Sequence, residues 1–165
     1  MLLDGCPHSP RTRMAYYRDL ATCDYFGPSD NQLIAVGWLA PGHEYSHGSV
    51  TSEFFRALAL LLVEPWQPMV FWGRASCFLC RFSSGPADVE YEGMKLNVGW
   101  ANLFVPGANC VFVAPSLIAH YIDSHDYSPP VEFQEAVLNC PPMRSMAYLK
   151  AIQAKSAFLT RLARR

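Results

Sequence analysis

Four potential metal ligands, arranged as two pairs, constrain the fold of this chain more than any other feature of its sequence. Cys77 and Cys80 are separated by two residues, and His120 and His125 are separated by four. A Cys-x2-Cys turn can hold an ion from one side while two histidines near a helix end hold it from the other. Two cysteines with two histidines are a common ligand set for structural Zn2+. The sequence therefore predicts one structural zinc site.

The distance between the two pairs along the chain indicates what kind of domain contains the site. Cys80 and His120 have 39 residues between them, whereas a small zinc finger has about a dozen. The site is then part of a larger domain, with the order of a zinc knuckle or treble clef: a Cys turn, a hairpin and a helix. Four protein ligands leave no coordination position open for water, so such a site supports folding and not catalysis.

Two alternatives to this interpretation stay open. Cys110 lies on a predicted strand that leads into the helix with the histidines, and Cys140 is another candidate, so either thiol can replace one histidine. The other alternative involves no metal, because thiols and imidazoles also occur as ordinary buried or surface side chains and a single Cys-x2-Cys motif is weak by itself. The two pairs together, in this order, favour zinc.

The composition predicts a single α+β domain. Of the 165 residues, 51% are apolar and 16% are charged, which is typical of a globular chain with a buried core. Proline and glycine turn signals separate many short elements. We expect a mixed or antiparallel sheet, a buried helix from about residue 51 to 64, a helix from 115 that carries both histidines, and C-terminal helices over 131–138 and 145–162. The expected strands cover 32–39, 68–72, 89–98, 100–105 and 109–113.

Charge is distributed unevenly along the chain. All 14 acidic side chains precede residue 144, together with seven of the 13 basic ones, whereas residues 144–165 carry six basic side chains and no acidic one. We therefore divide the chain into an irregular arm (1–13), a zinc-stabilised α+β domain (14–143) and a basic C-terminal helix (144–165). The helix can dock on the acidic body, or it can bind nucleic acid or an acidic protein. The basic side chains that would make this contact are Lys150, Lys155, Arg161 and Arg164.

One segment matches the signature of zinc peptidases. His43-Glu44-Tyr45-Ser46-His47 fits H-E-x-x-H, in which two histidines one helical turn apart bind Zn2+ and the glutamate activates a water. That mechanism requires a helix. Here Pro and Gly precede the motif, Gly and Ser follow it, and a predicted strand lies directly before it, so we expect a solvent-exposed loop.

Hydropathy indicates a protein without a membrane segment. No stretch reaches the roughly 18 apolar residues of a membrane span, since Arg56 and Glu64 flank the most apolar run. The first residues also lack the pattern of a secretory signal. We therefore expect a cytoplasmic protein, in which the six cysteines are ligands and buried thiols and not disulfides.

Several segments resemble a family of small, uncharacterised bacterial proteins. These segments are 33–39, 65–68, 101–107, 114–125 and 140–143, and the likeness covers roughly residues 24 to 150. The resemblance implies a Cys-x2-Cys knuckle and a His-Tyr-Ile-x-x-His helix as shared features, which agrees with the zinc site, and it implies a bacterial origin. The loop at 42–45 is also similar, but the family does not generally have H-E-x-x-H there. The resemblance implies no activity.

Three functional hypotheses follow from these observations. The first is a non-catalytic, zinc-stabilised binding module that contacts another protein, as an adaptor, a regulator or an immunity-type protein. The second is nucleic-acid binding through the basic helix at 144–165. The third is a zinc hydrolase based on His43, Glu44 and His47. The sequence contains no Gly-rich phosphate loop and no distinctive pair of carboxylates that would indicate another activity.

Overall fold

A three-stranded mixed sheet forms the centre of the fold in a computed structural model, which describes residues 15–27, 32–69, 73–83, 85 and 88–164. The strands lie in the order β1 (Leu33–Ala35), β5 (Val111–Pro115) and β4 (Asn102–Pro106). β1 runs parallel to β5, and β4 runs antiparallel to it. All five residues of β5 are buried, as expected for a central strand that is covered on both faces.

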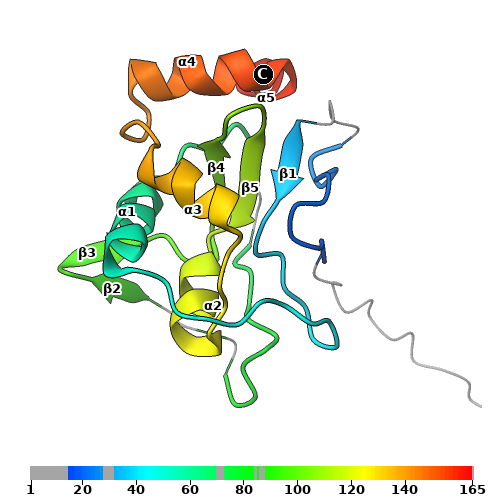
Figure 1. The fold of residues 1–165 in the computed structure, drawn as a ribbon, viewed down its shortest axis with the longest axis vertical. Coiled ribbons are helices and arrows are strands. Elements are labelled where there is room, and N and C mark those ends of the chain that lie inside the picture. Colours follow the sequence, from blue (N-terminus) through cyan, green and yellow to red (C-terminus); the bar gives the residue numbers. More distant parts are fainter. Residues whose placement is uncertain (1–14, 28–31, 70–72, 84, 86–87, 165) are drawn as a thin grey trace, which may run out of the picture.

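Each face of this sheet has its own core. One face packs against helices α1 (Ser52–Val63), α2 (Ile118–His125) and α3 (Val131–Leu138). The other packs against the segment 15–27 and against α4 (Met146–Lys155) and α5 (Ala157–Leu162). Figure 1 shows α4 and α5 crossing one end of the molecule, with α2 toward the other. The domain is therefore α+β, as the sequence predicts.

The alternation of side chains along β4 and β5 explains why both faces are apolar. Strand residues point alternately to opposite faces, so neighbours in the sequence enter different cores. The core with α1 contains Leu103, Val105, Phe112 and Ala114, and the core with α4 contains Phe104, Val111 and Val113. A central strand that is apolar at every position thus joins two separate layers of helices.

Helix α1 is the buried helix that the sequence predicts. Its N-cap is Thr51, whose Oγ1 accepts a hydrogen bond from the backbone N–H of Phe54 at 3.2 Å. Glu53 lies in the first turn, and the helix ends at Val63 with Glu64 as its C-cap. The apolar residues Phe54, Leu58, Ala59, Leu61 and Leu62 are buried against the first core.

The region from 89 to 98 forms a tight hairpin. It consists of β2 (Val89–Tyr91) and β3 (Met94–Leu96), paired antiparallel. The turn between them is Glu92-Gly93, and both residues have positive φ angles, 47° and 78°. Such a two-residue turn matches the twist of the flanking strands. The single strand expected over 89–98 is therefore wrong, because this turn divides it into two strands of three residues each.

The single C-terminal helix expected over 145–162 is wrong, because Ser156 divides it. This fully buried residue has an extended backbone (φ −146°) and separates α4 from α5. Its backbone N–H still donates to the Ile152 carbonyl of α4, while its Oγ accepts from the Leu159 N–H of α5. A serine hydroxyl that caps a new helix competes with continuation of the old one.

Other boundaries differ from the sequence predictions by a few residues. β1 covers only part of the expected strand 32–39, because Gly37 has a φ of +72° and its backbone lies against the Ile118 side chain. β5 continues to Pro115, so α2 begins at Ile118 and not at 115. α3 has the predicted bounds. The arm at 1–13 and residues 70–72 of the expected strand 68–72 lie outside the described residues, and 68–69 are not in a strand.

Side chains protect the outer edge of β4. The Gln67 side-chain amide donates to the Asn102 carbonyl at 2.6 Å, and its oxygen accepts from the Asn102 N–H at 3.1 Å. Two residues further along, the Tyr148 hydroxyl donates to the Phe104 carbonyl at 2.8 Å. These contacts occupy backbone groups that another strand could otherwise pair with. None of the helices in the described ranges is long and apolar enough to cross a bilayer.

Candidate metal centre

Cys77 and Cys80 lie on an irregular loop between α1 and β2, which we call the knuckle (residues 73–83). Gly85 packs directly behind Cys77: a Cβ on this glycine would lie 2.9 Å from the Cys77 Cβ, and its φ is +90°. Before the knuckle turn, the Ala75 N–H donates to the Gly99 carbonyl at 2.7 Å. The knuckle is thus anchored to the segment between β3 and β4.

His120 and His125 both lie on α2, which leaves β5 at the edge of the first core. Five positions on a helix correspond to about 140° around its axis beyond a full turn, so the two side chains do not share one helical face. They can still converge because His125 is the last residue of α2 and the following Asp126 is left-handed, with φ 53°. The two imidazole rings are nearly perpendicular, at 87°.

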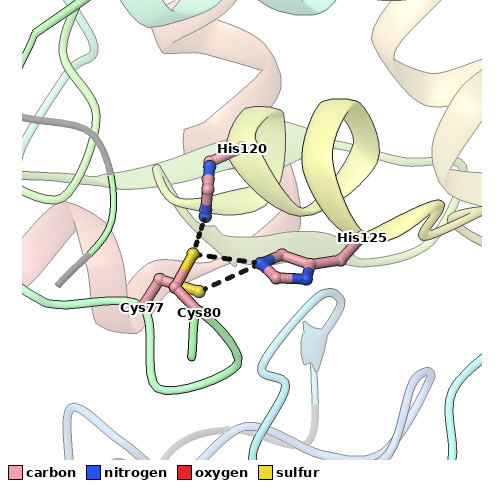
Figure 2. Close-up of side chains that lie close together, drawn as sticks. All are labelled: Cys77, Cys80, His120 and His125. Carbon is pink, nitrogen blue, oxygen red and sulfur yellow. Dashed lines mark hydrogen bonds between the residues drawn. The ribbon is translucent and has the colours of Figure 1, made fainter. Parts of the chain in front are cut away.

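The four side chains converge on one point between the knuckle and α2 (Figure 2). Sγ of Cys80 lies 3.3 Å from Nε2 of His120 and 3.5 Å from Nε2 of His125. Sγ of Cys77 lies 3.3 Å from Nε2 of His125. All four ligand atoms are within 4.8 Å of one another. A tetrahedral Zn2+ with its usual bond lengths separates sulfur and nitrogen ligands by about 3.6 Å, so these distances fit an ion of that size.

Within the part of the chain that the structure describes, this is the one group of three or more His, Cys, Asp or Glu donors close enough to hold an ion. Cys110 and Cys140 do not belong to it, although the sequence leaves either as a replacement for a histidine. The cluster could bind a metal ion through two sulfurs and two imidazole nitrogens, a donor set that suits Zn2+.

Burial determines the protonation of the cluster when no cation is bound. Cys77 is 2% exposed and His120 8% exposed. Burial raises the pKa of the Cys77 thiol and lowers the pKa of both imidazoles, and the neighbouring His125 lowers the pKa of His120 further. Neutral imidazoles have a lone pair free for a metal, whereas a buried thiolate needs a compensating cation. Both imidazoles are thus available as ligands, whereas a cation would have to displace the proton of the Cys77 thiol.

Tyr121, next to His120 in the sequence, has a polar group that the protein leaves unpartnered. The side chain is fully buried, and its hydroxyl has no hydrogen-bond partner. Burial raises its pKa, and negative charge at Cys77 and Cys80 raises it further. A buried hydroxyl donor beside sulfurs that become thiolates is consistent with an ionic centre at this place. Sequence reasoning did not identify this residue.

The H-E-x-x-H segment is a loop, as the sequence predicts, and it braces the end of α2. The Tyr45 hydroxyl donates to the His125 carbonyl at 3.2 Å, and the Gly48 N–H donates to the Asp126 carbonyl at 3.0 Å. His47 pairs with Tyr127 in an isolated β-bridge. The segment therefore lacks the helix that would place His43 and His47 on one face for a zinc hydrolase.

His43 and His47 are exposed and contact different aromatic rings. His43 stacks on Tyr16 with ring centroids 3.6 Å apart, and His47 lies against Tyr45 at 4.4 Å. The role of the loop in positioning His125 has no signal in the sequence, because it depends on Tyr45 reaching a backbone carbonyl 80 positions away.

The basic residues of the C-terminal region lie far from the metal centre, at the end of the molecule formed by α4 and α5 (Figure 1). Lys150, Arg161 and Arg164 are exposed. Lys155 is half-buried, and its Nζ donates to the Ala108 carbonyl in the turn between β4 and β5. The structure therefore uses one of the four predicted basic residues to dock α4 on the sheet.

A comparison with protein-family models gives one match. The model of a domain of unknown function, DUF7919, matches residues 15–138. The chain belongs to this family. The matched part of the DUF7919 domain contains the knuckle, all of α2 and the loop that braces it, while α4 and α5 follow it in the chain. Neither the curated proteins nor the solved structures include a significant match to the chain.

Proposed function

We propose that this DUF7919 protein is a non-catalytic binding module that a structural Zn2+ on Cys77, Cys80, His120 and His125 stabilises and that contacts another protein. One observation supports this proposal above all: four side chains from two separate segments present their donor atoms within 4.8 Å of one another. Two thiolates and two neutral imidazoles complete a tetrahedron around Zn2+, so no position remains for a substrate or an activated water.

The position of the cluster explains what the ion would stabilise. The knuckle has no regular secondary structure, and α2 has eight residues, too few for a stable isolated helix. A metal that joins them fixes the knuckle on the first core. Cys77, Cys80, Cys110 and Cys140 form no disulfide, and a zinc–thiolate site suits a reducing compartment such as the cytoplasm. That location, like the bacterial origin implied by the resemblance, stays a prediction.

Elemental analysis of the purified protein tests the metal site. We expect one zinc per chain in the wild type and in His43→Ala, and no zinc together with a loss of thermal stability in Cys77→Ser. Because Cys77 is almost fully buried, the loss is expected to be about 4 kcal/mol or more. Cys110→Ser is a matched control, since this thiol lies outside the cluster. Zinc that disappears only in His43→Ala, or no metal in any sample, would overturn the proposal.

Nucleic-acid binding through the basic residues is a second candidate, supported by the exposure of Lys150, Arg161 and Arg164. It requires affinity for DNA or RNA that falls steeply as salt rises, and that weakens when these three residues are replaced by Gln. Lys155 is omitted from this variant because its Nζ docks α4. Affinity that the three replacements leave unchanged eliminates this candidate.

A further inference from the structure

Three large aromatic side chains are exposed around the knuckle. Phe78, between the two cysteines, is 54% exposed, and Phe82, two residues after Cys80, is fully exposed. Trp100 is 58% exposed, and it follows Gly99, whose carbonyl accepts the Ala75 N–H at the start of the knuckle. We call Phe78, Arg81, Phe82 and Trp100 the knuckle face. Single exposed apolar residues are common, but several together indicate a binding surface.

The metal site offers a reason why these rings stay exposed. Cys77 and Cys80 point inward to the cluster, and between them Leu79 packs on the first core, whereas Phe78 and Phe82 are exposed. In a knuckle whose fold depends on a metal, the aromatic residues contribute little to the core: Phe78 and Phe82 are both absent from the two core clusters. Their exposure is therefore not explained by folding.

The knuckle face is positively charged on an otherwise acidic body. Between Glu64 and Asp88 the chain contains Arg74 and Arg81 and no acidic residue. Arg81 is exposed, and the ion pairs found among the described residues, Arg56 with Glu92 and Lys95 with Asp88, do not involve it. A Zn2+ with two thiolates and two neutral imidazoles carries no net charge, so a bound metal would not cancel this arginine.

These side chains match the chemistry of protein interfaces better than that of nucleic-acid sites. Aromatic residues and arginine are the residue types most enriched among those that dominate binding energy. A nucleic-acid strand requires several cations along its phosphates, whereas Arg81 is the one exposed basic residue of the knuckle and residues 1–143 have twice as many acidic as basic side chains. Charge complementarity thus favours a partner with carboxylates beside apolar side chains.

We propose that the knuckle face binds a segment of a partner protein in which Asp or Glu residues lie next to aromatic or aliphatic ones. A carboxylate of the segment accepts hydrogen bonds from the Arg81 guanidinium, and its apolar side chains cover Phe78, Phe82 and Trp100. This inference rests on the proposed function and specifies its surface and partner chemistry. The metal acts by holding the knuckle in the shape that presents these four side chains.

Selection from a phage-displayed library of random 12-residue peptides on the immobilised, zinc-loaded protein tests this proposal. The expected peptides carry Asp or Glu beside aromatic or aliphatic residues. A selected peptide, synthesised with a fluorophore, is then titrated with each variant by fluorescence anisotropy. We expect Arg81→Glu and Phe82→Ser each to weaken binding at least tenfold. Both side chains are exposed, so these variants are expected to fold and to retain their zinc.

Matched controls lie at the opposite end of the molecule. Met146→Ser on α4 and Arg161→Glu on α5 change an exposed apolar and an exposed basic side chain, and we expect unchanged affinity. No enrichment of acidic peptides overturns the proposal, as does equal binding by all variants. Binding of single-stranded oligothymidine that Arg81→Glu abolishes, or a dimer in light scattering that Phe82→Ser dissociates, also overturns it. If the peptide test fails while the protein still contains one zinc per chain, this surface is refuted and the metal site is unaffected. If the protein contains no zinc, the proposed function itself is refuted.

Discussion

The Tyr121 hydroxyl is buried without a partner, whereas the equally buried Tyr148 hydroxyl donates to the Phe104 carbonyl. The two buried tyrosines thus differ in one respect: the hydroxyl of Tyr148 makes a hydrogen bond and that of Tyr121 does not. An unpartnered buried hydroxyl costs free energy, and a satisfied one contributes to stability. The burial of the Tyr121 hydroxyl is therefore an uncompensated cost close to Cys77 and Cys80, whose negative charge raises the pKa of this hydroxyl further.

Replacing each tyrosine by phenylalanine measures this difference. We expect Tyr148→Phe to lower the free energy of unfolding by about 1 to 2 kcal/mol, because the Phe104 carbonyl loses its donor. Tyr121→Phe removes no hydrogen bond, so in metal-free protein we expect no loss, or a gain of up to about 1 kcal/mol. Urea unfolding in the presence of a chelator gives both values. An equal loss in the two variants would contradict the assignment of the Tyr121 hydroxyl as unpartnered.

Asp19 connects the N-terminal segment to the rest of the domain through side-chain hydrogen bonds. Its carboxylate accepts the Tyr127 hydroxyl at 2.9 Å and the Gly37 N–H at 2.9 Å. Burial nevertheless raises the pKa of this carboxyl above its ordinary value of 3.8, although both hydrogen bonds oppose the shift. The folded protein therefore binds a proton at Asp19 more tightly than the unfolded chain does. Its contribution to stability falls as the pH rises above 3.8 through the folded pKa.

Asp19→Asn tests this pH dependence, since asparagine keeps an acceptor oxygen but does not titrate. We expect the stability of the wild type, relative to this variant, to decrease as the pH increases from about 4 to 7. Asp19→Ala is the control for the hydrogen bonds: it leaves the Tyr127 hydroxyl and the Gly37 N–H without an acceptor, and we expect it to be about 2 kcal/mol less stable than Asp19→Asn at any pH. The measurement is the free energy of unfolding by denaturant at several pH values. Parallel pH profiles of this free energy for the wild type and Asp19→Asn would refute the raised pKa of Asp19.

At the scale of elements, the hydrophobic pattern and the residue spacing predict where helices and metal ligands lie. They do not predict where a helix or strand is interrupted. The 131–138 helix, the 51–64 helix and the Cys/His cluster follow from local signals: apolar periodicity, a Thr cap, and ligand spacing. Two interruptions do not follow from local signals. The turn at Glu92-Gly93 depends on a glutamate with a left-handed backbone, and the helix break depends on Ser156, which caps α5 from a buried position. Tyr45 acts on His125 through a tertiary contact that no short-range pattern encodes.

The break at Ser156 is itself a source of stability for α5. This short helix has six residues, and its first turn is capped by the Ser156 hydroxyl through the Leu159 N–H. We expect Ser156→Ala to cost about 1 to 2 kcal/mol and to loosen α5, because the cap is lost while Leu159 depends on it for its place in the second core. Ser124→Ala is a suitable control, since this exposed serine lies inside α2 and caps no helix. Thermal unfolding of the two variants that shows no difference would contradict the capping role.

At the scale of the whole molecule, the sheet separates the layer that contains the candidate metal site from a layer that does not. The proposed zinc site belongs to the layer of α1, α2 and α3, whereas α4, α5 and the segment 15–27 pack on the opposite face. The two layers share the strands between them, and Cys140 and Met143 after α3 also pack against both cores. Loss of the ion is therefore expected to destabilise one layer before the other.

Hydrogen exchange with and without a chelator tests this separation. After metal removal we expect exchange at least ten times faster for the backbone amides of α2 and of residues 73–83, because the contact between them is lost. Amides of α4 are expected to keep their protection, since the buried residues of this helix belong to the core that does not include the site. Zinc added back should restore the original pattern. Uniformly faster exchange throughout the described part of the chain would show instead that the two layers unfold together.

The residues that complete the second core lie partly outside the segment that matches the family model. The family match ends at residue 138, yet Tyr148, Ile152 and Leu159 close the core over Phe104 and Val113. The part of the chain that matches the family model is thus shorter than the part that builds both cores. Any relative with a different sequence after α3 must shield the same face of its sheet by other means, with its own terminal helix, a neighbouring domain or a second chain.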